Sequence, residues 1–262
     1  MSNFLWTNFE SIVSSRKKII LRDDQISWLE AMDLAEHLSS RKKALILIDT
    51  GCFSLAELEW LVLRRAIIVS YAETGRTWSD LLLLKKVASR VRRPVIFAFQ
   101  GEERESRGTE ALSALHQLAR GGLDLHLSGR KKTFDPEVLA HLAADCRLGH
   151  SWFVYYHYGG VDAWLIQLAK EKAWLHLDGR FLDESQLLSL EELLLSFPKG
   201  RVRLVLHLEE EASGIKLIEL VQKHGGYVIF FQPVSPPLKK RRYQKNLILP
   251  FRAYHLEPRA LF

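Results

Sequence analysis

Apolar runs of strand length recur nine times along the chain, and a segment of helix length separates each run from the next. Many of the runs are rich in β-branched and aromatic residues and several alternate with period two, which favours strands. Strands that return every 20 to 30 residues, roughly, predict parallel pairing through crossover helices. We therefore expect an α/β fold with parallel strands and all helices on one side. The expected strands cover residues 17–21, 44–49, 66–71, 95–99, 123–127, 152–158, 174–177, 202–208 and 227–231.

Capping signals support the helical segments between these runs. Ser54 with Glu57, and Asp183 with Gln186, have the spacing of a capping box. Asp135 followed by Pro136 matches the preferred pair at a helix N-terminus. Glycine pairs at residues 121–122 and 225–226 suit left-handed helix ends, so we expect helices to stop there.

The domain organisation follows from the same alternation. Because the connections between the expected strands are too short to hold a second domain, we predict one α/β repeat domain over residues 17–232. Residues 1–16 are expected to form an N-terminal helix or cap. A Pro-rich and basic linker with an apolar C-terminal tail is expected over residues 233–262.

Composition places the chain among ordinary globular proteins, with 262 residues of which 47% are hydrophobic. No stretch of about 18 consecutive apolar residues occurs, so no membrane span is expected. The two cysteines, Cys52 and Cys146, lie far apart and suit a reducing compartment. These features predict a cytoplasmic protein.

Two segments fifty positions apart echo one another. Residues 125–130 read LHLSGR and residues 175–180 read LHLDGR, and Asp135 and Asp183 then begin leucine-rich helices. Together these units resemble leucine-rich repeats of the longer, helix-containing type. That resemblance implies an open, curved parallel sheet, although Arg130 and Arg180 stand where the family places asparagine or cysteine. A closed (βα)₈ barrel of about 250 residues is the alternative architecture.

Histidines occupy similar places in four of the expected strands. We expect them to share the face of the sheet opposite the leucines that meet the helices, because strand side chains alternate between faces. Acidic residues follow at the strand ends, where open α/β sheets and barrels bind ligands. The acids also suit the starts of the following helices. The candidate binding face comprises His126, His157, His176, His207, Asp178 and Glu209.

The C-terminal tail changes character after the last expected strand. A basic cluster at residues 239–245 is followed by an apolar segment, so the tail is expected to cap its own sheet or to contact a partner. A basic run with a tyrosine also suits contacts with phosphates. The candidate partner-binding residues in the tail are Lys239, Lys240, Arg241, Arg242, Tyr243, Leu249, Phe251 and Tyr254.

The sequence contains none of the phosphate-binding loops, nucleophile elbows or zinc-binding motifs that identify an enzyme class. We therefore predict no cofactor, no metal and no assigned catalytic residue. The leading hypothesis is a non-enzymatic interaction or scaffold subunit of a larger assembly, which binds a protein partner through the tail or the polar strand face. One alternative is a barrel enzyme with a site at the carboxyl ends of the strands. Another is a binder of nucleic acid or acidic surfaces through the basic tail.

Overall fold

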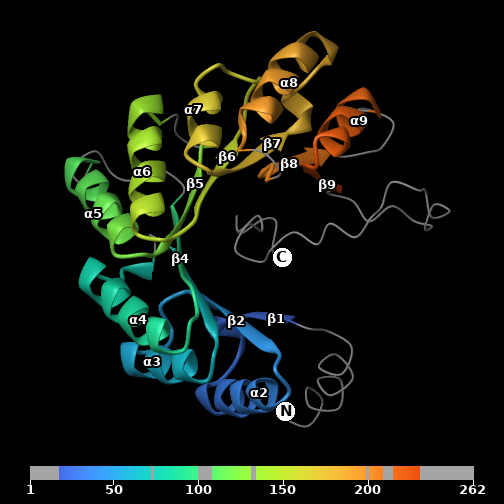
Figure 1. Cartoon of the computed structure of the whole chain (residues 1–262). Coiled ribbons are helices and arrows are strands. Elements are labelled where there is room, and N and C mark those ends of the chain that lie inside the picture. The colour runs from blue at the N-terminus through green and yellow to red at the C-terminus, as the bar shows by residue number, and fades with distance from the viewer. Residues whose placement is uncertain are drawn as a thin grey trace, which may run out of the picture. The chain divides into compact units, whose positions relative to one another are not determined.

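The computed structural model describes residues 18–71, 74–99, 108–130, 134–198, 201–208 and 215–230 (Figure 1). The chain divides into two compact units, Met1–Ala98 and Phe99–Phe262. The single repeat domain expected over residues 17–232 stays a prediction. The expected N-terminal cap at 1–16 and the tail at 233–262 lie outside the described residues.

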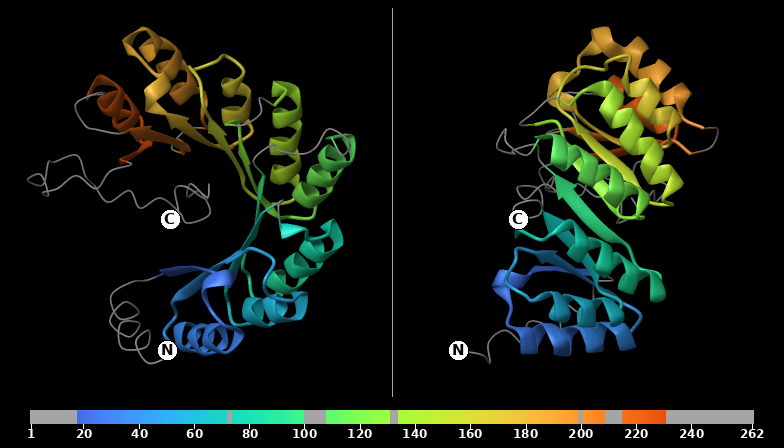
Figure 2. Two further views of the ribbon diagram at one scale, coloured as in Figure 1. Left: turned by 180° about the vertical axis from the view of Figure 1, so that it is seen from behind. Right: turned by 90° about the vertical axis from the view of Figure 1, so that its left-hand side faces the viewer.

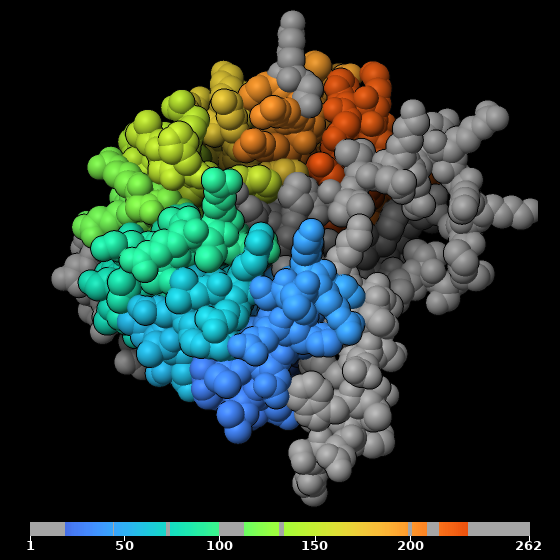
Figure 3. Space-filling model, turned by 60° about the horizontal axis from the view of Figure 1, so that its bottom comes forward, coloured from blue at the N-terminus to red at the C-terminus, as the bar shows by residue number. Residues whose placement is uncertain are grey.

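The first unit is built on four parallel strands that follow one another in chain order. The helices α2, α3 and α4 lie side by side and present a continuous surface of packed side chains (Figure 3). The strands are β1 (Lys18–Arg22), β2 (Ala44–Asp49), β3 (Ile67–Tyr71) and β4 (Val95–Phe99). The helices are the short 3-10 helix η1 (Asp23–Gln25), α2 (Trp28–Ser40), α3 (Leu55–Leu63) and α4 (Trp78–Arg90).

Among the described residues of this unit, each of the three α-helices begins with a capping box. In each, a hydroxyl at the N-cap accepts from the backbone N–H three residues on, and the acid there accepts from the N-cap backbone N–H. The box expected at Ser54 is confirmed, and equivalent boxes begin at Ser27 and Thr77. Since these bonds are local, each helix start is dictated by its own short segment.

The second unit has five parallel strands, again in chain order. They are β5 (Asp124–Ser128), β6 (Phe153–His157), β7 (Trp174–Asp178), β8 (Leu204–Leu208) and β9 (Tyr227–Phe230). The helices are α5 (Gly108–Arg120), α6 (Pro136–Leu148), α7 (Leu165–Lys170), α8 (Leu187–Ser196) and α9 (Ile215–Lys223), with 3-10 turns η4 (Gly179–Phe181) and η5 (Glu184–Gln186).

The two faces of the second sheet differ in chemistry. Helices α5 to α9 cover one face (Figure 2), where fully buried leucines such as Leu127, Leu177 and Leu206 point. We call the other side of the β5–β9 sheet the histidine face. The expected α/β class, with parallel strands alternating with helices, is confirmed. Among the described residues, no helix is both long and apolar enough to cross a membrane.

Candidate functional site

The strand register places four ring side chains on the histidine face. Tyr156 of β6 lies level with His176 of β7. His126 lies level with Val154, and His207 lies level with Asp178. Because residues two apart along a strand share a face, His126, Tyr156, His176 and His207 lie diagonally across four strands.

These four side chains are joined by short contacts. His126 Nδ1 lies 2.8 Å from the Tyr156 hydroxyl, and His176 Nδ1 lies 2.8 Å from His207 Nε2. The rings of Tyr156 and His176 lie 4.6 Å apart, and those of His176 and His207 are stacked at 5.0 Å. All four residues are buried. The arrangement holds two imidazoles in direct hydrogen-bonding contact, so a proton donated by one ring is accepted by the other.

Asp178 adds a carboxylate at the end of β7. Its side chain is 5% exposed and binds Arg180 Nη2 at 2.6 Å, and it also accepts from the Arg180 backbone N–H at 3.0 Å. Burial alone would raise the pKa of Asp178, but the Arg180 hydrogen bonds and the nearby His207 hold that pKa below its ordinary value. The site therefore combines an ionised carboxylate with two linked imidazoles at the carboxyl ends of β7 and β8.

His157 does not belong to this group, and the expectation that all four histidines share one face is wrong. Its register partner is Leu177, which points toward the helices. The His157 ring lies edge-on to Trp164 at 5.4 Å, and its Nε2 lies 2.7 Å from the Gly160 carbonyl oxygen. Burial is the main reason that the pKa of His157 is lowered. His157 thus closes the turn that follows β6.

Several predicted residues lie outside the described part of the chain. These are Glu209 and the tail residues Lys239, Lys240, Arg241, Arg242, Tyr243, Leu249, Phe251 and Tyr254. Their assignment to a binding face or a partner surface stays a prediction. Within the described ranges, no group of three or more His, Cys, Asp or Glu side chains is arranged to hold a metal ion.

Sequence reasoning missed two features of the strand ends. Tyr156 sits between His126 and His176, and the alternation within residues 152–158 was the signal that could have placed it on this face. In the first unit, Arg76 binds Asp49, and Asp23 accepts from the backbone N–H groups of Cys52 and Phe53. No local motif marks these contacts, because the partners lie 27 to 30 residues apart.

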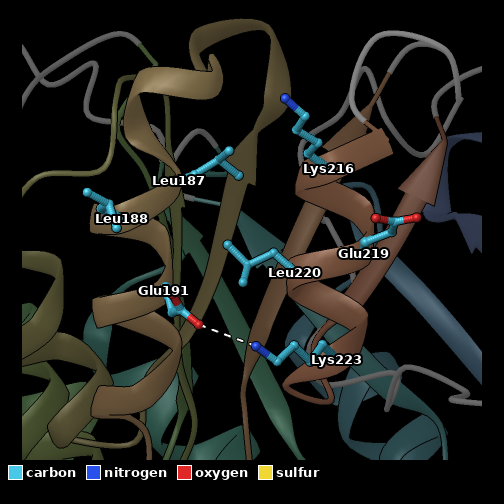
Figure 4. A pocket seen from close by; sticks show the side chains of 7 residues that line it. All are labelled: Leu187, Leu188, Glu191, Lys216, Glu219, Leu220 and Lys223. Carbon is cyan, nitrogen blue, oxygen red and sulfur yellow. Dashed lines mark hydrogen bonds and ion pairs between the residues drawn. The ribbon is translucent and has the colours of Figure 1, made fainter.

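A shallow groove of about 290 Å³ lies between α8 and α9 (Figure 4). Leu187, Leu188 and Leu220 form its apolar part. Glu191 pairs across it with Lys223, and their charged atoms are 3.5 Å apart. The groove contains none of the predicted site residues, so it is separate from the histidine face.

Comparison with known proteins identified no matching family model and no matching curated protein. Among solved structures, dihydrodipicolinate synthase from Bacillus clausii is similar at 14% sequence identity and a TM-score of 0.33. The match covers 83% of this chain and 70% of that chain.

Two predictions made from the sequence are corrected. The resemblance to leucine-rich repeats is not upheld. The turn after β7 also differs chemically from that family, since Arg180 binds the Asp178 carboxylate where an asparagine would bond to the turn backbone. The prediction of a non-enzymatic scaffold subunit is not upheld either.

Proposed function

We propose that the chain is an enzyme that acts on a small molecule by general acid–base chemistry at the carboxyl ends of β7 and β8. The observation that carries this proposal is the 2.8 Å contact between His176 Nδ1 and His207 Nε2 beside the buried carboxylate of Asp178. An imidazole is the side chain best suited to proton transfer near neutral pH.

Each group has a distinct role in this proposal. His207 exchanges a proton with the substrate, and His176 accepts or returns that proton through their shared hydrogen bond. Asp178 lies level with His207 in the neighbouring strand, so its negative charge stabilises the imidazolium form of His207. Arg180 keeps Asp178 ionised. His126 and Tyr156 belong to the supporting polar surface of the same face.

The test is a turnover screen with matched variants. The purified full chain, His207→Gln and His141→Gln are each incubated with a mixture of small metabolites, and mass spectrometry follows loss of substrate and gain of product. His141 is an exposed residue of α6, so it controls for the loss of one imidazole. Removing an acid–base group is expected to slow turnover by about 10²- to 10⁴-fold. Equal turnover by His207→Gln and the full chain would contradict the proposal.

The proposed location is the cytoplasm. The two cysteines support it, because both are free thiols and Cys146 is buried. Binding of acidic partners through the basic segment at residues 239–245 stays a prediction.

A further inference from the structure

The first unit carries a concentration of cations along one edge of its sheet. Its strands are parallel and its helices return between them, so the C-terminal ends of α2, α3 and α4 lie at the edge where β2, β3 and β4 begin. These helices lie side by side (Figure 3), so the three turns at this edge are neighbours. Six cations of these turns, five of them exposed and the last half-buried, form what we call the basic edge: Arg41, Lys42, Arg65, Arg90, Arg92 and Arg93.

The three turns share one backbone conformation. Lys42, Arg65 and Arg92 have positive φ angles of 57°, 70° and 55°, and the next backbone N–H in each turn donates to a carbonyl near the end of the preceding helix. In the described part of the second unit, four turns have the same conformation, and glycine occupies two of these positions, at Gly122 and Gly225. Glycine adopts a positive φ without the steric cost that a longer side chain incurs. Cations at all three positions of the first unit therefore indicate a role for their side chains.

The basic edge also differs from the second unit in its ion pairs. In the second unit, Arg147 near the end of α6 binds Glu171 with 2.9 Å between the charged atoms. Among the described residues, by contrast, none of the six basic-edge cations forms an ion pair with an acid, and the nearby Glu36 contacts Arg64 at 3.9 Å instead. A helix C-terminus attracts a cation, but it does not relieve the repulsion between the cations of adjacent turns.

Arg93 shows this repulsion directly. Its Nε is buried and has no hydrogen-bond partner among the described residues. The pKa of Arg93 is lowered, mainly by burial and further by the positive charge of Arg65 in the neighbouring turn. An anion that accepts hydrogen bonds from both guanidinium groups would satisfy the unpaired donor and offset the repulsion.

The repetition and the chemistry of these cations limit the kind of anion. Equivalent cations recur at the starts of adjacent strands, about 4.8 Å apart, which suits a ligand whose negative charges also recur. Arginine predominates, and its planar fork binds two oxygens of one phosphate. Membrane surfaces are bound by cations together with inserted apolar side chains. Of the exposed large apolar side chains described in the first unit, only Leu63 lies beside a basic-edge turn, so a phosphate polymer fits better than a bilayer.

We propose that the basic edge of the first unit binds the phosphate backbone of nucleic acid without reading its base sequence. Contacts from arginine and lysine to phosphates supply affinity and position, but they carry no sequence information. This binding is a further activity of the chain. It belongs to the first unit and does not depend on the acid–base site proposed for the second.

The experiment measures binding of the full chain to a fluorescein-labelled DNA duplex of mixed sequence, by fluorescence anisotropy at several salt concentrations. The edge variant combines Lys42→Gly, Arg65→Gly and Arg92→Gly. Because glycine suits the positive φ at these positions, the variant removes three charges and keeps the turns. The matched pair is Arg65→Gly and Lys172→Gly, since Lys172 is an exposed cation with a φ of 64° in an equivalent turn of the second unit.

We expect the full chain to bind the duplex with a Kd of about 10⁻⁴ to 10⁻⁶ M near physiological salt, and more weakly as salt is added. At about 0.1 M salt the edge variant should bind about 10²-fold more weakly. Its slope of log affinity against log salt should be shallower by about 3, because each lost phosphate contact reduces the slope by about 1. Arg65→Gly alone should reduce the slope by about 1, and Lys172→Gly should leave it unchanged.

Equal slopes for the full chain and the edge variant would overturn the inference. Equal losses in Arg65→Gly and Lys172→Gly would also overturn it, because binding would then follow net charge and not the basic edge. A charge-matched tail variant, Lys239→Gln with Lys240→Gln and Arg241→Gln, tests the basic tail in the same way. Loss of binding in the tail variant but not in the edge variant would place the nucleic-acid contact in the tail.

Two further measurements keep the outcome decisive. Vesicles that contain phosphatidylserine are titrated in parallel, and vesicle binding that needs the basic edge, without duplex binding, would assign the edge to anionic lipid and refute the proposal. Thermal unfolding checks the fold of every variant. If the edge variant unfolds early, the double variant Arg41→Gln with Arg90→Gln decides the question, because both side chains are exposed at helix ends and glutamine is tolerated in helices.

Discussion

The Arg76 guanidinium donates a hydrogen bond to each carboxylate oxygen of Asp49. Its Nε lies 2.9 Å from Oδ2 and its Nη2 lies 2.8 Å from Oδ1, and Asp49 is 0% exposed. Ser70 Oγ donates to the same carboxylate at 2.9 Å, and the Gly51 N–H donates at 3.1 Å. This network ties the ends of β2 and β3 to the turn before α4, so one buried charge organises the strand ends of the first unit.

Replacing Arg76 with alanine should destabilise the protein strongly. The substitution leaves the Asp49 carboxylate buried without its cation, and breaking a buried pair in this way costs about 3–5 kcal/mol. The matched control is Arg64→Ala, whose 3.9 Å contact with Glu36 is largely exposed and should contribute less than about 1 kcal/mol. Urea unfolding of both variants measures the difference. Similar midpoints for the two would show that the Asp49–Arg76 pair is not a main support of the fold.

Asp145 should give stability a specific dependence on pH. The carboxylate is buried and lies 2.6 Å from His116 Nδ1 and 2.8 Å from Arg120 Nε. Burial opposes ionisation, but the bonds from Arg120 and His116 outweigh it and lower the pKa of Asp145. A carboxyl whose pKa is lower in the folded state stabilises the protein above its unfolded pKa of about 3.9, and this contribution disappears as pH falls through the folded value.

Asp145→Asn should therefore be less stable than the unmodified chain at pH 7, by about 1.5–3 kcal/mol for lost hydrogen bonds to a charged group. The difference should shrink progressively below about pH 4. Asp33→Asn, at an exposed position of α2, should change stability by no more than about 0.5 kcal/mol. Denaturant titrations at several pH values measure both variants. A deficit in Asp145→Asn that stayed constant down to pH 2 would exclude the ionised pair as its source.

Replacement by alanine should destabilise the protein far more at one glycine, Gly149, than at another, Gly160. A Cβ at Gly149 would lie 2.1 Å from the backbone oxygen of Ala119, which cannot move without shifting α5. A Cβ at Gly160 would lie 2.1 Å from the amide nitrogen of Gln186, the end of a flexible side chain. We expect Gly149→Ala to cost about 1–3 kcal/mol or more, and Gly160→Ala to cost less than about 1 kcal/mol. Thermal unfolding of the pair compares them directly, and a larger loss at Gly160 would refute the close packing of α5 against the C-terminal end of α6.

Local structure was predicted well where its cause is local. The expected strands at 44–49 and 95–99 match β2 and β4 at both ends, and α6 begins at Pro136 after the Asp135 cap, as expected. At Asp183 the prediction differs from the structure, because its carboxylate accepts from the Ser185 N–H and begins a 3-10 turn. The long leucine helix therefore starts at Leu187, four residues later.

Helix ends show where local rules were insufficient. In the part of the chain that the structure describes, five positions between a helix and the next strand have positive φ without being glycine: Lys42, Arg65, Arg92, His150 and Lys172. The left-handed conformation costs a non-glycine residue about 1–2 kcal/mol. This cost is offset by backbone hydrogen bonds from the residue that follows to the last turn of the helix. The Lys43 N–H donates to the Leu38 carbonyl, and the Arg93 N–H donates to the Ala88 carbonyl. Glycine alone therefore does not predict where these helices end, because other residues also adopt the left-handed conformation there.

The candidate site was also predicted only in part from local sequence. Residue parity within each strand correctly placed His126, His176 and His207 on the face opposite the helices. His157 was misassigned because it was aligned with the others by its position in the apolar run. The register of β6 instead sets Tyr156 level with His176, and a shift of one residue exchanges the two faces of a strand.

The amino-acid sequence by itself determined the alternation of strands and helices, because hydrophobic periodicity and capping act over a few neighbouring residues. Only the tertiary structure decided which polar side chains meet. Asp49 binds Arg76, which lies 27 residues further along the chain, and His176 contacts His207, which lies 31 residues further along. Such pairs depend on the register between parallel strands, which is set by the packing of whole strand–helix segments and leaves no local mark in the chain.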